Sequence, residues 1–196
     1  MKKSKEERPD VAAPAIKLTN ISKNFGPVQA NKNISLSVNV GTIHGIVGEN
    51  GAGKSTLMSI LYGFYKADSG EIFVNGNKTI IPDSQAAISA GIGMVFQHFK
   101  LVDTFTVLEN IILGVEDVKH GILQYEDAVK KITQLIETYQ LNVDLNAYIK
   151  DITVGQQQRV EILKMLYRDS DILIFDEPTA VLTPQEIHEL INIIKG

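Results

Sequence analysis

The stretch IHGIVGENGAGKSTLMSIL, residues 43–61, places a glycine-rich segment between two apolar runs of different period. Residues 43–48 form a short, mostly apolar run of the kind that a buried strand shows. After the glycines, Leu57, Ile60 and Leu61 recur at the spacing of one helix face. The stretch therefore predicts a strand, a loop and a helix in succession.

The loop matches the pattern G-x-x-x-x-G-K-[ST] at every fixed position. Glycines let backbone N–H groups converge on phosphate oxygens, and the start of the following helix adds its positive end. Lys54 can reach the outer phosphates of a nucleotide, and the Ser55 hydroxyl can ligate Mg²⁺. The alternative is a glycine-rich turn that carries a lysine and a serine by chance. The candidate nucleotide-binding residues are Gly48, Glu49, Asn50, Gly51, Ala52, Gly53, Lys54, Ser55 and Thr56.

A second apolar run, DILIFDE at 171–177, ends on two adjacent carboxylates. We expect Asp176 and Glu177 at the carboxyl edge of a sheet, where α/β proteins bind their ligands. Since successive strand residues point to opposite sides, Asp176 can hold hydrated Mg²⁺ while Glu177 faces the attacking water as a base. Alone, the pair could equally solvate the end of a strand.

The remaining pattern divides the chain into an antiparallel part and a helical part. Between Ile16 and Val40, apolar and polar residues alternate as in half-buried strands, and the run 71–76 ends on the hairpin signal Asn75–Gly76. GIGMVFQ at 91–97 is a further buried strand, and residues 106–166 are mostly helical in pattern. The last predicted helix has Thr183 as its N-cap.

The bulk composition is that of a globular protein with one or two compact units, since 44% of the 196 residues are hydrophobic. The formal net charge of −4 argues against nucleic acid as a partner. With no cysteine, the chain has no disulfide, thiolate metal site or cysteine nucleophile.

The ends of the chain and its apolar runs bear on localisation. Residues 1–15 begin with charges of both signs and lack the apolar run of a signal peptide, so they predict a disordered tail. The longest apolar runs fall far short of the roughly 20 residues that span a bilayer. Any membrane role is therefore expected to depend on a partner.

The segment ITVGQQQRVEI, residues 152–162, resembles the signature sequence of the ABC transporter family, and the similarity continues through QQRVEILKMLYRDSDILIFDEPT. The resemblance implies that this segment closes over the γ-phosphate bound by an opposite subunit, with Thr153, Val154, Gly155 and Gln156 as the contacting residues. Val154 stands where the family usually has glycine, and Thr183 stands where many members have aspartate. Without the resemblance, the segment is a capped amphipathic helix.

The same resemblance assigns further residues. Phe25 would stack on adenine, and Gln97 would touch Mg²⁺, act in catalysis and sense a membrane partner, while Glu177 would be the catalytic glutamate. Taken alone, Phe25 would be an ordinary exposed or core residue and Gln97 plain surface. The implied fold is an α/β P-loop NTPase of RecA-like type over residues 16–196. It has a core sheet, an antiparallel β layer and a helical subdomain inserted at about 103–166.

Within the family, the sequence of these segments is most similar to that of the first ATP-binding domain of importers of simple sugars or nucleosides. That implies an ATPase at the cytoplasmic side of the cell membrane, peripheral to transmembrane permease subunits. It also implies a second ABC domain, in tandem or as a dimer, and an indirect link to an extracytoplasmic solute-binding protein. The alternatives are a soluble ABC ATPase without a transport role and a nucleotide-binding fragment that lacks catalysis.

In the family, a switch histidine follows one more strand, and its position falls beyond Gly196. That strand lies between the strand before the phosphate loop and the strand before the acidic pair. Without it, buried backbone groups of both would lose their partners. We therefore expect the 196-residue chain alone to be poorly stable or inactive.

Overall fold

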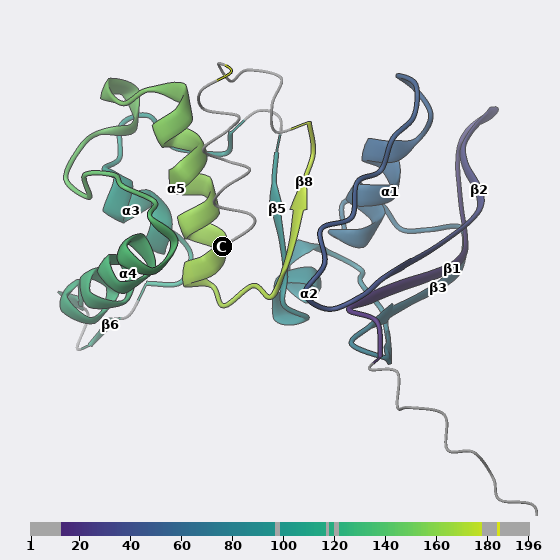
Figure 1. Ribbon diagram of the computed structural model, residues 1–196, viewed down its shortest axis with the longest axis horizontal. Helices are drawn as coiled ribbons and strands as arrows, with labels where there is room; N and C mark the ends of the chain where they lie inside the picture. The colour runs from purple at the N-terminus through teal and green to yellow at the C-terminus, as the bar shows by residue number, and fades with distance from the viewer. Residues whose placement is uncertain (1–12, 97–98, 117, 120–121, 178–183, 185–196) are drawn as a thin grey trace, which may run out of the picture. The chain divides into compact units, whose positions relative to one another are not determined.

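The computed structural model describes residues 13–96, 99–116, 118–119, 122–177 and 184 (Figure 1). The chain divides into two compact units. The first contains described residues up to Leu57 together with 66–80, and the second contains 58–65 and the described residues from Ile81 onward. Each unit is described by itself.

The first unit is built on a four-stranded antiparallel sheet. Its strands are β1 (Ile16–Phe25), β2 (Val28–Val38), β3 (Ser69–Val74) and β4 (Asn77–Thr79), in the order β2-β1-β3-β4. Figure 1 shows β1 and β3 running side by side. The apolar residues on one side of the sheet are buried: Ile16, Leu18, Ile21 and Val74. The alternation between Ile16 and Val40 thus predicted strands β1 and β2 correctly.

Both central residues of the β3–β4 turn have the backbone conformation that the sequence predicts. Asn75 and Gly76 have φ angles of 49° and 80°, and positive φ at both central residues is the requirement of a type I′ turn. Val74 pairs with Asn77 across it. The hairpin predicted from Asn75–Gly76, and its return to the antiparallel layer, are confirmed.

A bulge in β2 changes which side chains face inward. Ile21 pairs with Ile34, but Lys23 pairs with Asn31, so β2 uses one more residue than β1 over this interval. Asn33 lies inside the bulge with φ at 49°. Because an extra residue inverts the alternation, Asn31 is turned into the interior and is 4% exposed.

The strand predicted at 43–48 is absent from the described residues: only turn and irregular backbone lies between β2 and α1 (Lys54–Leu61). Val47 is 97% exposed and Ile43 is 65% exposed. A strand depends on a hydrogen-bonded neighbour, and among the described segments none pairs with these residues. The sequence prediction of a buried strand is therefore wrong for this chain.

The second unit contains a parallel strand pair, β5 (Ile92–Val95) with β8 (Ile172–Phe175). All four residues of β5 are buried, as the apolar run in GIGMVFQ predicts. Ile92 pairs with Ile172 and Val95 with Phe175, so both strands end at the same edge. The short helix α2 (Ser84–Ser89) precedes β5 and starts at the N-cap Asp83.

Three helices make up most of the region predicted to be helical: α3 (Val107–Ile112), α4 (Glu126–Tyr139) and α5 (Val154–Tyr167). Figure 1 shows them gathered in one cluster. A hairpin of β6 (Val118–Lys119) and β7 (Ile122–Leu123) and a 3₁₀ turn, η1 (Ile149–Asp151), interrupt the helices. The cluster has its own apolar core, which includes Val107, Ile111, Ile132, Leu141, Ile149, Val160 and Leu163.

None of the helices within the described residues has the length and apolar character needed to cross a membrane.

Candidate functional site

The glycine-rich loop in the first unit is closed by its own lysine. Lys54 donates from Nζ to the carbonyl oxygens of Gly48, at 2.7 Å, and Glu49, at 2.9 Å. An ammonium has three N–H groups, so these bonds use two of them and hold the positive charge over the loop. Within the loop, the Ala52 amide donates to the Glu49 carbonyl at 3.2 Å. The motif therefore forms a compact turn, and the Lys54 ammonium is hydrogen-bonded across that turn.

Two glycines of the loop occupy backbone conformations that other residues rarely adopt. Gly51 has φ at 83° and Gly53 has φ at 84°. A Cβ on Gly53 would also collide with the carbonyl oxygen of Ala30 on β2. Gly53 is thus required twice, for its conformation and for the close approach of the loop to β2.

Asn31 fixes the point where the loop becomes a helix. Its Nδ2 donates to the Gly53 carbonyl oxygen at 3.1 Å, and the Leu57 amide donates to the same oxygen at 2.9 Å. The Oδ1 atom of Asn31 is buried and has no hydrogen-bond partner among the described residues. Sequence reasoning missed Asn31, because simple alternation along β2 places it on the outer side.

Ser55 and Thr56 lie in the first turn of α1. Ser55 is exposed and Thr56 is half-buried. The Ser55 hydroxyl is a hard oxygen donor of the type that Mg²⁺ prefers.

Phe25, the predicted base-stacking residue, ends β1 and is 40% exposed. The Lys23 ammonium lies 5.4 Å from the centroid of the Phe25 ring. Phe25 belongs to the first unit, which also carries the phosphate loop.

The acidic pair follows β8 in the second unit. The Asp176 amide donates to the Val95 carbonyl oxygen at 3.1 Å, which extends the β5–β8 pairing by one residue. Asp176 is half-buried, whereas Glu177 is exposed with φ at 48°. The left-handed backbone is uncommon for a residue other than glycine, and such outliers occur often at functional sites. Gln97 and Thr183 lie outside the described residues.

The signature-like segment in the second unit forms a capped helix start. Thr153 is the N-cap of α5: its Oγ1 accepts from the Gln156 amide at 3.3 Å, and its amide donates to Gln156 Oε1 at 2.9 Å. This reciprocal arrangement is a capping box. Val154 is 41% exposed, and Gly155 is buried. The capped amphipathic helix read from the sequence is therefore present.

A buried charged pair further along α5 binds the segment that follows Gln97 in the chain. The Lys100 amide donates to Glu161 Oε1 at 2.7 Å, and Lys164 Nζ donates to the Lys100 carbonyl oxygen at 3.1 Å. Glu161 is 1% exposed and Lys164 is 8% exposed. Burial raises the pKa of Glu161 and lowers the pKa of Lys164, and the attraction between the two charges opposes both shifts.

Sequence reasoning also missed this pair, since nothing local marks a helical glutamate and lysine as buried. Arg168, the C-cap residue of α5, also binds a distant segment: its guanidinium donates to the Leu113 carbonyl oxygen at 2.6 Å. The C-terminal half of α5 therefore binds the backbone after Gln97 and the end of α3 through side chains.

Comparison with known families decides the identity of the fold. A family model described as ABC transporter matches residues 31–180, which include the loop, the capped helix start and the acidic pair. The chain belongs to the ABC transporter family.

Two curated ABC relatives are similar over most of the chain. The nucleoside import ATP-binding protein NupA of Lactococcus lactis subsp. cremoris is 56% identical over 181 residues, which are 92% of this chain and 36% of that protein. The guanosine import ATP-binding protein NupO of Bacillus subtilis is 54% identical with the same coverage. The chain thus spans about a third of the length of the curated relatives it matches.

Solved structures of ABC cassettes support the same family assignment. An ATP-binding cassette of an ABC transporter in its ADP conformation matches with a TM-score of 0.82 and 30% identity, over 93% of this chain and 76% of that chain. A dimeric cassette in a post-hydrolysis state, bound to ADP and Pi, matches with a TM-score of 0.74 and 28% identity, over 91% and 81%. The α/β P-loop NTPase fold predicted from the sequence is confirmed.

Proposed function

We propose that this chain binds MgATP and forms the ATP-hydrolysing part of an ABC importer. The observation that supports this most directly is the loop at 48–55, with the Lys54 ammonium bound across it and two glycines at positive φ. A loop of this kind directs N–H groups and one cation toward the same anion, which suits the phosphates of a nucleotide.

The side chains that would hold Mg²⁺ are of the chemical type that this ion prefers. Ser55 offers a hydroxyl and Asp176 a carboxylate, and Gln97 would add an amide oxygen; all are hard oxygen ligands. Bound Mg²⁺ would neutralise charge that develops on the phosphate oxygens during hydrolysis. Asn31 donates to the Gly53 carbonyl and so would fix the peptide group that carries the Lys54 amide, which faces the phosphates in this proposal.

Glu177 would accept the proton of the attacking water or orient that water. Its carboxylate is exposed at the end of β8, one residue beyond Asp176. A positioned carboxylate in this role accelerates such a reaction by roughly 10²–10⁴-fold.

The proposed partners follow from the family and from the names of the relatives. The chain would act with a second ABC domain, tandem or dimeric. Its own signature segment at Thr153–Gln156 would meet the nucleotide bound by that domain. Transmembrane permease subunits would use the hydrolysis cycle for transport at the cytoplasmic side of the membrane, and a solute-binding protein would deliver the solute to them. The similarity to NupA and NupO favours a nucleoside as the solute, with a simple sugar as the next candidate.

The variant Glu177→Gln, made in the full-length gene product, tests the ATPase assignment. It removes the base and keeps the size of the side chain, so we expect turnover to fall about a hundredfold or more while MgATP affinity stays within twofold of wild type. Phosphate release measures turnover, and titration with a fluorescent ATP analogue measures affinity. Glu126→Gln, at the exposed start of α4, is the matched control. Wild-type turnover in Glu177→Gln would refute the role of Glu177.

A further inference from the structure

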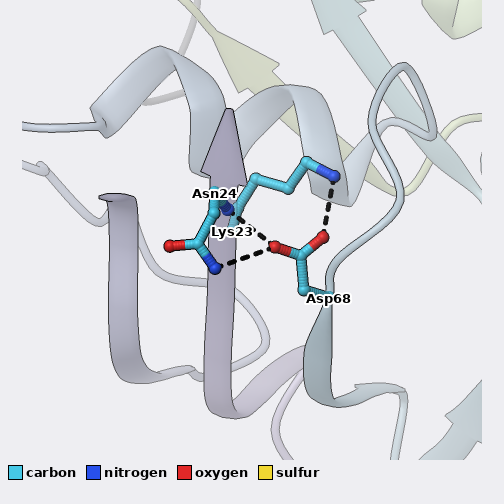
Figure 2. Close-up of polar contacts among 3 residues, drawn as sticks. All are labelled: Lys23, Asn24 and Asp68. Atoms are coloured by element: carbon cyan, nitrogen blue, oxygen red, sulfur yellow. Dashed lines mark hydrogen bonds and ion pairs between the residues drawn. The ribbon is translucent and has the colours of Figure 1, made fainter. Parts of the chain in front are cut away.

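The carboxylate of Asp68 accepts three hydrogen bonds from two consecutive residues of β1 (Figure 2). Lys23 Nζ donates to Oδ1 at 3.0 Å, while the Asn24 amide and Asn24 Nδ2 donate to Oδ2 at 2.7 and 3.1 Å. Figure 2 shows the two β1 side chains converging on the one carboxylate. All three residues belong to the first unit.

The backbone of Asp68 is attached to the same strand. Its amide donates to the Ser22 carbonyl oxygen at 2.9 Å, and Ser22 pairs with Ser69 at the start of β3. The hydrogen bond from Lys23, and then that from the Asn24 amide, lower the pKa of Asp68, so the carboxylate is charged near neutral pH. Asp68 therefore fixes the last residues of β1 through both its backbone and its side chain.

The residue that follows this network is Phe25, at the tip of the β1–β2 hairpin. Phe25 pairs with Val28, and Gly26 in the turn has φ at 57°. The Lys23 ammonium that binds Asp68 also lies 5.4 Å from the centroid of the Phe25 ring. The Asp68 carboxylate thus fixes both the Lys23 ammonium next to the Phe25 ring and the backbone of Asn24, which precedes Phe25.

A fixed and partly exposed aromatic ring suits recognition of a flat heteroaromatic base. Stacking is tighter when the ring is already in place, because ordering a mobile side chain costs binding free energy. The ion pair between Lys23 and Asp68 is partly exposed, since the Lys23 side chain is 16% exposed and the Asp68 side chain is 40% exposed.

We propose that Asp68 is a positioning residue for the nucleobase: by holding Lys23 and Asn24, it presents the Phe25 ring to the base of the bound nucleotide. This inference rests on the proposed function, since it requires a nucleotide with its phosphates on the loop at 48–55. It adds that base recognition and phosphate recognition depend on different polar networks of the first unit.

The test compares MgATP with magnesium tripolyphosphate, which has the phosphates and lacks the base. In Asp68→Asn, an amide replaces the carboxylate beside the Lys23 ammonium. We expect MgATP affinity to fall about three- to tenfold, as part of the roughly five- to hundredfold that a full base–aromatic stack contributes. Tripolyphosphate affinity should stay within twofold of wild type, which also shows that the variant is folded.

Glu71→Gln is the matched control, because it removes the carboxylate of the exposed Glu71–Lys78 ion pair on the same sheet. Both affinities should stay at their wild-type values there. Lys23→Gln is a second variant with the same expected loss for MgATP alone. In the background of Phe25→Ala, adding Asp68→Asn should weaken MgATP binding no further.

Equal loss of both ligands in Asp68→Asn and Lys23→Gln, or no loss of either, would overturn the inference and leave the proposed function standing. Wild-type MgATP affinity in Phe25→Ala would do the same. A wild-type chain that binds neither ligand would overturn the proposed function, and the inference with it.

Discussion

At the scale of single residues, the phosphate loop depends on a side chain outside its own motif. Lys54 and the glycines have the geometry that the motif requires, and the sequence was sufficient to find them. Asn31 was not predictable, because a bulge around Asn33 decides which face of β2 it occupies. Its bond to Gly53 joins β2 to the start of α1.

Removing the amide of Asn31 should weaken phosphate binding. In Asn31→Ala the Gly53 carbonyl loses one donor, and we expect affinity for both MgATP and tripolyphosphate to fall about three- to tenfold. Asn31→Asp should weaken both further, because it adds a buried negative charge beside an anion-binding loop. Isothermal titration calorimetry measures both affinities.

Asn77→Ala on β4 is the control, because it removes an exposed asparagine from the same sheet. If Asn31 only filled space, Asn31→Ala would be the more damaging change and Asn31→Asp the milder one. That order of effects would contradict the role given to Asn31.

At the scale of elements, α5 combines two features that the sequence shows unequally. Its capped start at Thr153 is local and was predictable, because threonine is a preferred N-cap residue directly before an amphipathic helix. Its buried face with Glu161 and Lys164 was not, because the partner is the backbone of Lys100, which lies about 60 residues earlier in the chain. The helix therefore connects the signature segment to the segment after Gln97.

Breaking this buried pair should destabilise the second unit. In Glu161→Ala, the Lys100 amide loses its acceptor and the Lys164 ammonium loses its neighbouring carboxylate, so we expect the free energy of unfolding to fall by about 3 kcal/mol. The double variant with Lys164→Met should lose less than the sum of the single losses. Asp127→Ala in the exposed pair with Lys130 on α4 is the control, with an expected change within about 0.5 kcal/mol.

The pH dependence of folding stability gives an independent check on the burial of the Glu161 carboxylate. Because burial raises the pKa of Glu161 in the folded chain, its protonation favours the folded state as pH falls through the interval between the raised pKa and the ordinary one. Relative to Glu161→Gln, the wild-type chain should therefore gain stability as pH falls through that interval. A constant difference between the two across it would show that the Glu161 carboxylate does not titrate as inferred.

At the scale of the whole molecule, the chain divides into two compact units, and the second contains the apolar core of the helical cluster. The segment 43–48, directly before the phosphate loop, has no strand partner among the described residues. By contrast, Ile92 and Val95 on β5 are fully buried and paired with β8. Apolar sequence alone did not make residues 43–48 a strand.

Hydrogen exchange should separate these two segments. Amides of residues 43–47 should exchange within seconds at neutral pH, while those of β5 and β8 should be protected at least a hundredfold more, because only the latter are paired and buried. Exchange followed by mass spectrometry measures both, with the β1–β3 pairing as an internal reference. Strong protection at 43–47 would mean that this segment pairs in solution.

The sequence by itself determined the features that depend on neighbours along the chain. These are the phosphate loop, the Asn75–Gly76 turn, the capped start of α5 and the apolar strands β5 and β8, and each rests on a few adjacent residues with restricted backbone or clear periodicity. Only the tertiary structure decided that Asn31 faces inward, that Asp68 holds the end of β1, and that Glu161 and Lys164 are buried. Those outcomes depend on register and on contacts between distant segments, which local pattern does not record.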